Sequence, residues 1–108
     1  MSSVSTHVLD TALGKPAANL HVKLEIKASD AWTPLAEAVT NADGRISSFV
    51  PGNVELAPGI YQLRFDTSAY QTGFYPEVTV TFRIDHAAQH YHVPLLLSPF
   101  GYSTYRGS

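Results

Sequence analysis

The stretch Leu20-His21-Val22-Lys23-Leu24-Glu25-Ile26-Lys27 alternates apolar and polar residues without a break. Successive side chains of a β-strand point to opposite faces, so this alternation predicts a strand with one packed face and one face in water. The same alternation recurs in residues 61–65 and 78–84. Sequences that favour turns separate the strands, at residues 14–16, 41–44, 50–53 and 57–59. We therefore predict an all-β sandwich.

A single segment, residues 67–72, has the character of a short helix, with Asp66 or Thr67 as its side-chain cap and Gly73 as its stop. The sequence shows no internal repeat, low-complexity tract or linker. The chain has 108 residues, which is a common size for an independently folding domain. We expect a single compact domain over residues 1–108.

The composition argues against several classes of function. A net charge of −2 and seven scattered Lys and Arg residues leave no basic stripe that could bind a nucleic acid. The lack of cysteine removes disulfides, a thiolate nucleophile and cysteine-ligated zinc. Residues 1–6 lack the positive charge and apolar run of a secretory signal, and no segment reaches membrane-spanning length. We therefore expect a cytoplasmic protein without a membrane partner.

Residues 89–97 differ from the other expected strands because both of their faces carry hydrophobic groups. The odd-numbered positions from 91 onward are all apolar, whereas the even-numbered face combines His90 and His92 with Pro94 and Leu96. In a small sandwich, a strand that is apolar on both sides implies that its outer face is covered as well. An oligomer is therefore expected, with the two histidines at a subunit interface.

Three parts of the sequence form recognisable motifs. The first is Ser5-Thr6-His7-Val8-Leu9-Asp10, which continues through Gly14-Lys15-Pro16-Ala17. The second is the turn Thr40-Asn41-Ala42-Asp43-Gly44-Arg45. The third runs from His90-Tyr91-His92-Val93-Pro94-Leu95-Leu96-Leu97-Ser98-Pro99 into Tyr102-Ser103-Thr104-Tyr105-Arg106-Gly107-Ser108. Together these motifs resemble the transthyretin-like family of 5-hydroxyisourate hydrolases over nearly the whole chain, and the ending is their most specific part.

The resemblance implies a transthyretin-like, two-sheet β-sandwich of about eight antiparallel strands. It implies a homotetramer, a dimer of dimers, with active sites in clefts across the dimer–dimer contact. It also implies an enzyme of purine and urate degradation, in which water opens the lactam ring of 5-hydroxyisourate to give a ureido-imidazoline carboxylate on the way to allantoin. No cofactor and no metal are implied.

The resemblance also assigns the site. In the family the reacting groups are a histidine of the first strand, an arginine after the central turn and a histidine of the Val-Pro-Leu-Leu strand. These catalytic groups carry over to His7, Arg45 and His92. The substrate-binding ending carries over to Tyr105, Arg106, Gly107 and Ser108.

These residue types suit the opening of a lactam by water. Imidazole has a pKa of about 6.5, so near neutral pH it can take a proton from water and return one to the departing ring nitrogen. We assign His92 as the base toward water and His7 as its partner in orientation or proton transfer. Arg45 offers a planar fork of donors that can hold the developing oxyanion. No serine stands in a recognisable nucleophile motif.

Other interpretations stay open on the sequence alone. His90 and His92 could be two ligands of a metal ion with His7 as the third, although a bare His-x-His is a weak signal. The protein could instead carry a small hydrophobic ligand, as transthyretin does, but a carrier site should be lined mainly by apolar groups. His21 and His86 are expected at the surface. Core or interface positions are expected for the aromatic residues Trp32, Tyr61, Phe65, Tyr75 and Phe82.

Overall fold

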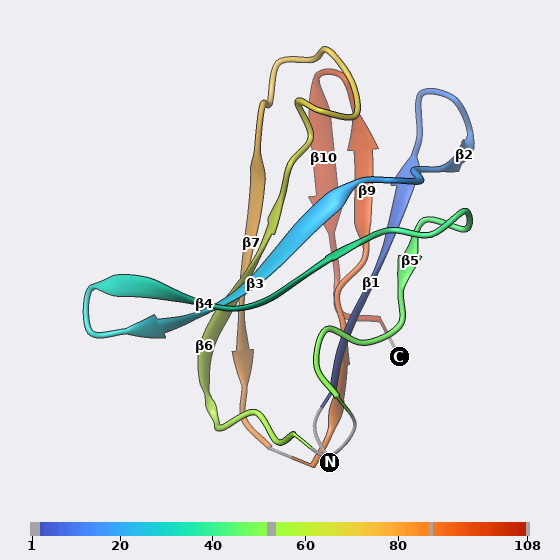
Figure 1. Ribbon diagram of the computed structural model, residues 1–108. Helices are drawn as coiled ribbons and strands as arrows, with labels where there is room; N and C mark the ends of the chain where they lie inside the picture. The colour runs from blue at the N-terminus through green and yellow to red at the C-terminus, as the bar shows by residue number, and fades with distance from the viewer. Residues whose placement is uncertain (1–2, 52–53, 87, 108) are drawn as a thin grey trace.

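The computed structural model describes residues 3–51, 54–86 and 88–107. Its two β-sheets pack face to face, which confirms the all-β, two-sheet sandwich (Figure 1). One sheet has the strand order β10-β9-β1-β2, with β5 and β8 also paired to β1. The other sheet has the order β4-β3-β6-β7. No helix long and apolar enough to cross a membrane occurs within these described ranges.

The strands of the first sheet are β1 (Ser3–Asp10), β2 (Lys15–Pro16), β5 (Arg45–Ile46), β8 (His90–His92), β9 (Leu95–Ser98) and β10 (Gly101–Thr104). The strands of the second sheet are β3 (His21–Ala28), β4 (Ala31–Val39), β6 (Gly59–Phe65) and β7 (Val78–Ile84). β3, β6 and β7 cover the three stretches of alternating sequence, so the three strands predicted there are confirmed.

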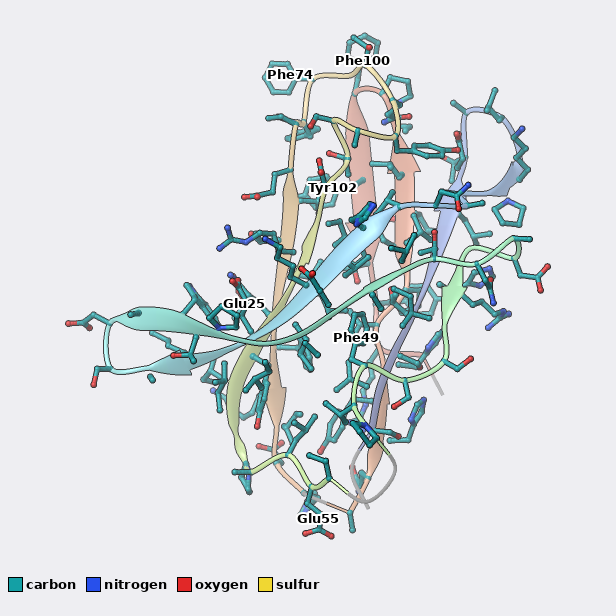
Figure 2. The ribbon with its side chains drawn as sticks, viewed as in Figure 1. Glu25, Phe49, Glu55, Phe74, Phe100 and Tyr102 are labelled. Carbon is teal, nitrogen blue, oxygen red and sulfur yellow. The ribbon has the colours of Figure 1, made fainter. Side chains whose placement is uncertain are left out.

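The core lies between the two sheets. Leu24 of β3 and Leu63 of β6 are fully buried, and Val4 and Val8 of β1 join them from the first sheet. Phe49, in the segment that follows β5, packs into the same core (Figure 2). Burying a side chain of this size stabilises the fold by about 1.5–3 kcal/mol. These contacts occupy the inner face of the first sheet and leave its outer face for other groups.

The first sheet is mixed, which differs from the antiparallel arrangement expected. β1 pairs in parallel with β8, where Val4 lies opposite Tyr91, and with β9, where Leu9 lies opposite Leu96. Parallel neighbours need a long connection between them. Here that connection is most of the chain, because the strands of the second sheet lie between β1 and β8 in sequence.

The short helix expected over residues 67–72 is not formed. The segment makes a single turn, in which the N–H of Gln71 donates to the carbonyl oxygen of Thr67 at 3.0 Å. Asp66 does cap this turn through its Oδ1. The hydroxyl of Thr67 donates to the carbonyl oxygen of Tyr75 at 2.5 Å and ties the turn to the chain that follows it. Starting a helix is unfavourable, and so short a segment cannot offset that cost with further turns.

The strand expected over residues 89–97 divides into β8 and β9 at Val93 and Pro94. Pro94 has no N–H to offer a neighbouring strand. Val93 still pairs with β1, because its N–H donates to the carbonyl oxygen of Ser5 at 3.0 Å. The division keeps both halves beside β1 and leaves the side chain of His92 on the outer face of the sheet.

Candidate functional site

The central turn places Arg45 beside β1. Gly44 has a φ of 73°, and a Cβ on it would lie 2.5 Å from the carbonyl oxygen of Val8, so this position requires glycine. Asn41 shapes the turn because its Oδ1 accepts a hydrogen bond from the N–H of Arg45 at 3.0 Å. Arg45 then enters β5, where it is the partner of His7 in the antiparallel register with β1.

His92 reaches the same face through the parallel pairing of β8 with β1, in which it lies opposite Ser5. Ser5 and His7 are two positions apart on β1, so both point to the outer face. The structure thus brings His7, Arg45 and His92 together. Arg45 and His92 line one recess of about 230 Å³, whereas His7 stands beside it as the strand partner of Arg45. The remaining lining residues are Ser5, Thr6, Ile46, Ser47 and His90.

The surroundings of His92 favour its neutral form. The ring is half-buried, and the hydroxyl of Ser5 lies 2.7 Å from its Nδ1. Burial lowers the pKa of His92 below its usual 6.5, and the charges of His90, Arg45 and His7 lower it further. The imidazole is therefore neutral at neutral pH. Because Nδ1 is engaged by Ser5, Nε2 is the nitrogen left to accept a proton.

The C-terminal tail contacts His92 through Gly107. The N–H of Gly107 donates to the carbonyl oxygen of His92 at 2.9 Å and forms an isolated β-bridge. A Cβ at this position would lie 2.4 Å from the Cδ2 atom of the His92 ring, so the close approach requires glycine. The hydroxyl of Thr104 anchors the tail by donating to the carbonyl oxygen of Pro94 at 2.6 Å. Ser108 lies outside the described residues.

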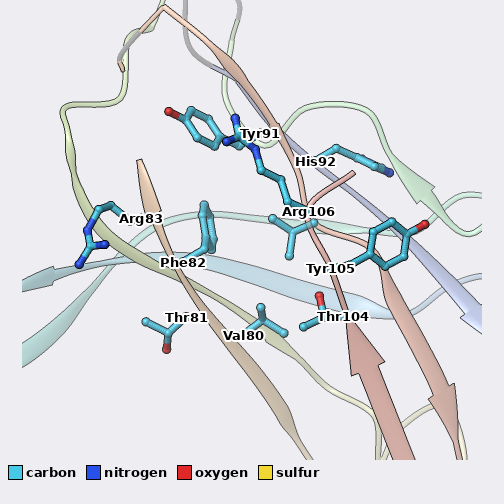
Figure 3. A pocket seen from close by; sticks show the side chains of 10 residues that line it. Val80, Thr81, Phe82, Arg83, Tyr91, His92, Thr104, Tyr105 and Arg106 are labelled. Carbon is cyan, nitrogen blue, oxygen red and sulfur yellow. The ribbon is translucent and has the colours of Figure 1, made fainter. Parts of the chain in front are cut away.

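The side chains of Tyr105 and Arg106 lie outside the recess that holds Arg45. They line a second cavity of about 320 Å³ together with Phe82 of β7 (Figure 3). The guanidinium of Arg106 stacks over the ring of Tyr91, 4.8 Å from its centre. His92 is among the residues that line both cavities. Substrate contacts by Tyr105 and Arg106 stay a prediction.

Two residues of the site were not found from the sequence in the roles they have here. The sequence gives no nucleophile motif around Ser5, and it suggests His90 only as an interface residue or a metal ligand. The hydroxyl of Ser5 lies 2.9 Å from the Nε2 atom of His90, in addition to its contact with His92. Within the described residues no three His, Asp or Glu side chains are placed to hold a metal ion, so His7 does not join the histidine pair as a third ligand.

Most of the other aromatic and histidine residues have the environments expected, whereas Trp32 is not part of the core cluster and its interface position stays a prediction. His21 and His86 are exposed. Tyr61 and Phe65 are buried in the core. Trp32, Tyr75 and Phe82 are half-buried.

Fold and site together define a class of protein. It is a two-sheet β-sandwich with a candidate acid–base site on the outer face of one sheet, where a neutral imidazole and a guanidinium share an open recess. An imidazole can move protons and a guanidinium can stabilise an oxyanion, so this pair suits the attack of water on a carbonyl group.

The chain belongs to the HIUase/Transthyretin family, whose model matches residues 4–107. It is similar to the 5-hydroxyisourate hydrolase of Salmonella dublin, with 46% identity over 110 residues that cover 97% of this chain and 80% of that protein. Klebsiella pneumoniae 5-hydroxyisourate hydrolase has a similar solved structure, with a TM-score of 0.85, 36% identity, and coverage of 98% of this chain and 99% of that one. Transthyretin from Sparus aurata is similar as well, with a TM-score of 0.87, 33% identity, and coverage of 96% and 95%.

Proposed function

We propose that this chain is a 5-hydroxyisourate hydrolase of urate degradation and that the recess beside His92 is its active site. The observation that carries the proposal is the convergence of Arg45 and a His92 of lowered pKa on one open recess. The similar proteins of Salmonella dublin and Klebsiella pneumoniae bear this name. The reaction is the opening of the lactam ring by water, and its product leads towards allantoin.

His92 is the general base of the proposed mechanism. Nε2 takes a proton from water as the water oxygen attacks the lactam carbonyl carbon, while Ser5 holds Nδ1. Arg45 donates to the carbonyl oxygen as negative charge develops on it. The proton then passes from Nε2 to the ring nitrogen as the carbon–nitrogen bond breaks. His7, the strand partner of Arg45, orients the reacting groups or shares in proton transfer.

The C-terminal run completes the substrate site in this proposal. Gly107 brings the tail against the ring of His92, so groups at the end of the chain are close to the reacting atoms. We assign substrate binding to Tyr105, Arg106, Gly107 and Ser108. Adding a few residues after Ser108 would crowd the tail beside His92 and should impair activity. A fully active extended protein would contradict this assignment.

We also propose that the protein is a homotetramer, a dimer of dimers, whose dimer–dimer contact covers the outer face of the first sheet. Leu9 and Leu96 are partners in the register of β1 and β9 and remain half-buried on that face. Phe74 and Phe100 are 71% and 81% exposed and stand at one end of the sandwich (Figure 2). Exposed apolar groups of this size favour association. Native mass spectrometry tests the proposal, and a monomer at micromolar concentration would overturn it.

Transport of an apolar ligand is the competing function. A solved sea bream transthyretin structure is a complex with thyroxine. The recess of this chain is lined instead by Ser5, Arg45, His90 and His92, and this polar lining suits an oxygen-rich heterocycle better than a hydrophobic ligand. We therefore favour hydrolysis, by a mechanism that requires no cofactor.

The decisive experiment generates 5-hydroxyisourate with urate oxidase and follows its ultraviolet absorbance with and without this protein. We expect the absorbance to decay faster when the protein is present. Unchanged decay would overturn the proposed function. The cytoplasmic location and the single-domain organisation of residues 1–108 remain predictions from the sequence.

A further inference from the structure

A second histidine is connected to His92 through a hydroxyl group. The parallel register of β1 and β8 sets Ser3 opposite His90 and Ser5 opposite His92, all on the outer face. The Oγ atom of Ser5 lies 2.7 Å from Nδ1 of His92 and 2.9 Å from Nε2 of His90. The hydroxyl of Ser3 is hydrogen-bonded to the remaining nitrogen of His90, Nδ1. The chain of contacts therefore runs from the recess, through Ser5, to an exposed imidazole.

The hydrogen bonds that connect His92, Ser5 and His90 can point in either of two directions. A serine hydroxyl has one proton, and a neutral imidazole has one N–H, so Ser5 can donate to only one of the two rings. If Ser5 donates to His92, Nε2 of His92 carries a proton and acts as an acid toward the recess. If Ser5 donates to His90, Nδ1 of His92 donates to Ser5, and Nε2 of His92 is an open base. Reversing the chain thus converts His92 from a base into an acid.

We propose that Ser5 and His90 form a proton relay with His92, which moves charge from the half-buried ring of His92 to the exposed ring of His90 during the reaction. The proposal rests on the proposed hydrolase function. As Nε2 of His92 takes the proton of the attacking water, its Nδ1 proton passes to Ser5 and the Ser5 proton passes to Nε2 of His90. Water has then lost one proton, His92 is neutral and His90 is an imidazolium.

The return step closes the proton balance. Nε2 of His92 gives its proton to the departing ring nitrogen, and the proton on Nε2 of His90 returns through Ser5 to Nδ1 of His92. Both imidazoles recover their starting forms, and the net result is the transfer of one proton from water to the leaving nitrogen. In each step His92 and Ser5 both make one bond to hydrogen and break another, whereas His90 makes one in the first step and breaks it in the second.

The electrostatics of the recess favour this direction of charge movement. The titratable or charged side chains that surround His92 are His7 on β1, Arg45 on β5 and His90 on its own strand. A positive charge held on His92 is opposed by burial and by these neighbours, which together lower its pKa. His90 is exposed, so water can stabilise a charge on its ring. The guanidinium of Arg106 is engaged with the ring of Tyr91.

Two variants test the relay. Ser5→Ala removes the connecting hydroxyl, and His90→Gln leaves a polar group beside Ser5 that cannot carry the proton onward. We expect each variant to lower kcat by about 10–100-fold with little change in KM, because proton transfer typically contributes on this scale. The double variant should be no slower than the slower single variant, because both changes break the same chain. His21 is an exposed histidine of β3, so His21→Gln is the matched control and should keep the wild-type kcat.

The pH profile and solvent isotope effects distinguish a proton relay from a role in which Ser5 and His90 only orient the ring of His92. His90→Gln removes a charge that lowers the pKa of His92, so the acid limb of kcat/KM should move to higher pH. In mixtures of water and deuterium oxide, the wild-type rate should reveal more than one proton in motion, and the rate of Ser5→Ala should reveal one. Wild-type kcat in His90→Gln would overturn the proposal, and so would an unchanged isotope response in both variants.

NMR of the histidine ring nitrogens in the free protein tests the relay without any substrate, because it reports which nitrogen of His92 carries the proton. We expect Ser5→Ala and His90→Gln each to change the ratio of His92 tautomers, whereas His21→Gln leaves it unchanged. If the wild-type protein fails to hydrolyse 5-hydroxyisourate, the proposed function falls, and these spectra still report on the hydrogen-bonded chain. An unchanged His92 tautomer ratio in both variants would overturn the relay. Where Ser5→Ala does not fold, His90→Gln alone supplies the same decision.

Discussion

Replacing Gly107 with alanine should strongly reduce catalysis while leaving the fold intact. The added Cβ would lie 2.4 Å from Cδ2 and 3.2 Å from Cγ of the His92 ring. Carbon atoms pack at about 3.5–4.0 Å, so the tail and the ring must separate by about 1 Å. Either the ring tilts away from Ser5 or the tail leaves the site. Misplacing a reacting group by about 1 Å can lower a rate by on the order of 100-fold, which is the fall in kcat we expect.

Gly101→Ala is the matched control for this substitution. It lies on β10 in the same C-terminal segment, and its added Cβ would meet only the Ser98 hydroxyl at 3.8 Å, an ordinary contact. Initial rates of 5-hydroxyisourate decay compare the two variants, and circular dichroism reports their unfolding. Gly107→Ala loses at most one backbone hydrogen bond, worth about 1 kcal/mol, which is too little to unfold the protein. Wild-type kcat in Gly107→Ala, or an equal loss in Gly101→Ala, would refute the reasoning.

Three other perturbations address the base, the oxyanion site and the fold. Arg45→Ala and His92→Asn should each lower the rate by at least ~100-fold in the absorbance assay, and wild-type rates in both would show that the site is misplaced. The acid limb of the kcat/KM profile should lie below pH 6.5, because the base works only when unprotonated and both burial and the nearby charges lower the pKa of His92. An acid limb above pH 6.5 would contradict the assignment. Tyr70→Phe removes the 2.7 Å hydrogen bond from the phenol to the buried carboxylate of Asp10. The free energy of unfolding in urea should fall by about 1–2 kcal/mol, with kcat unchanged. An unaltered urea midpoint would argue against this stabilising role.

The sequence predicted the strands whose two faces have different surroundings. β3, β6 and β7 each bury one face in the core, so apolar and polar residues alternate along their sequences. β4, an edge strand, shows no such alternation because most of its residues are exposed. It also contains Pro34, which an edge strand tolerates because the missing N–H need not reach a neighbour. β7 lies at the other edge of the same sheet, yet its alternate residues are buried, so local periodicity finds a strand by the burial of one face rather than by its place in the sheet.

The site was only partly predictable for a related reason. His7, Arg45 and His92 were named from a family resemblance, which identifies residues without giving their contacts. The bridge from Ser5 to both histidines depends on the parallel register of β1 with β8, and these strands are separated by nearly the full length of the chain. No local pattern specifies which of two distant strands will pair or in what register. The family resemblance placed His7 on the first strand, and the fold supplied its neighbours.

The outer face of the first sheet divides into a polar half and an apolar half. His7 of β1 and His92 of β8 belong to the polar half, whereas Leu9, further along β1, and Leu96 of β9 belong to the apolar half. Burying apolar surface stabilises a protein by about 25 cal/mol per Å², so burial against another subunit is favourable for the apolar half. The polar half must stay open to substrate. In the proposed tetramer, a subunit seated on the two leucines meets both needs, because it buries them and forms a wall of the recess. Assembly and catalysis then depend on one strand register, since a slip of one residue would turn the leucines and the histidines toward the core together.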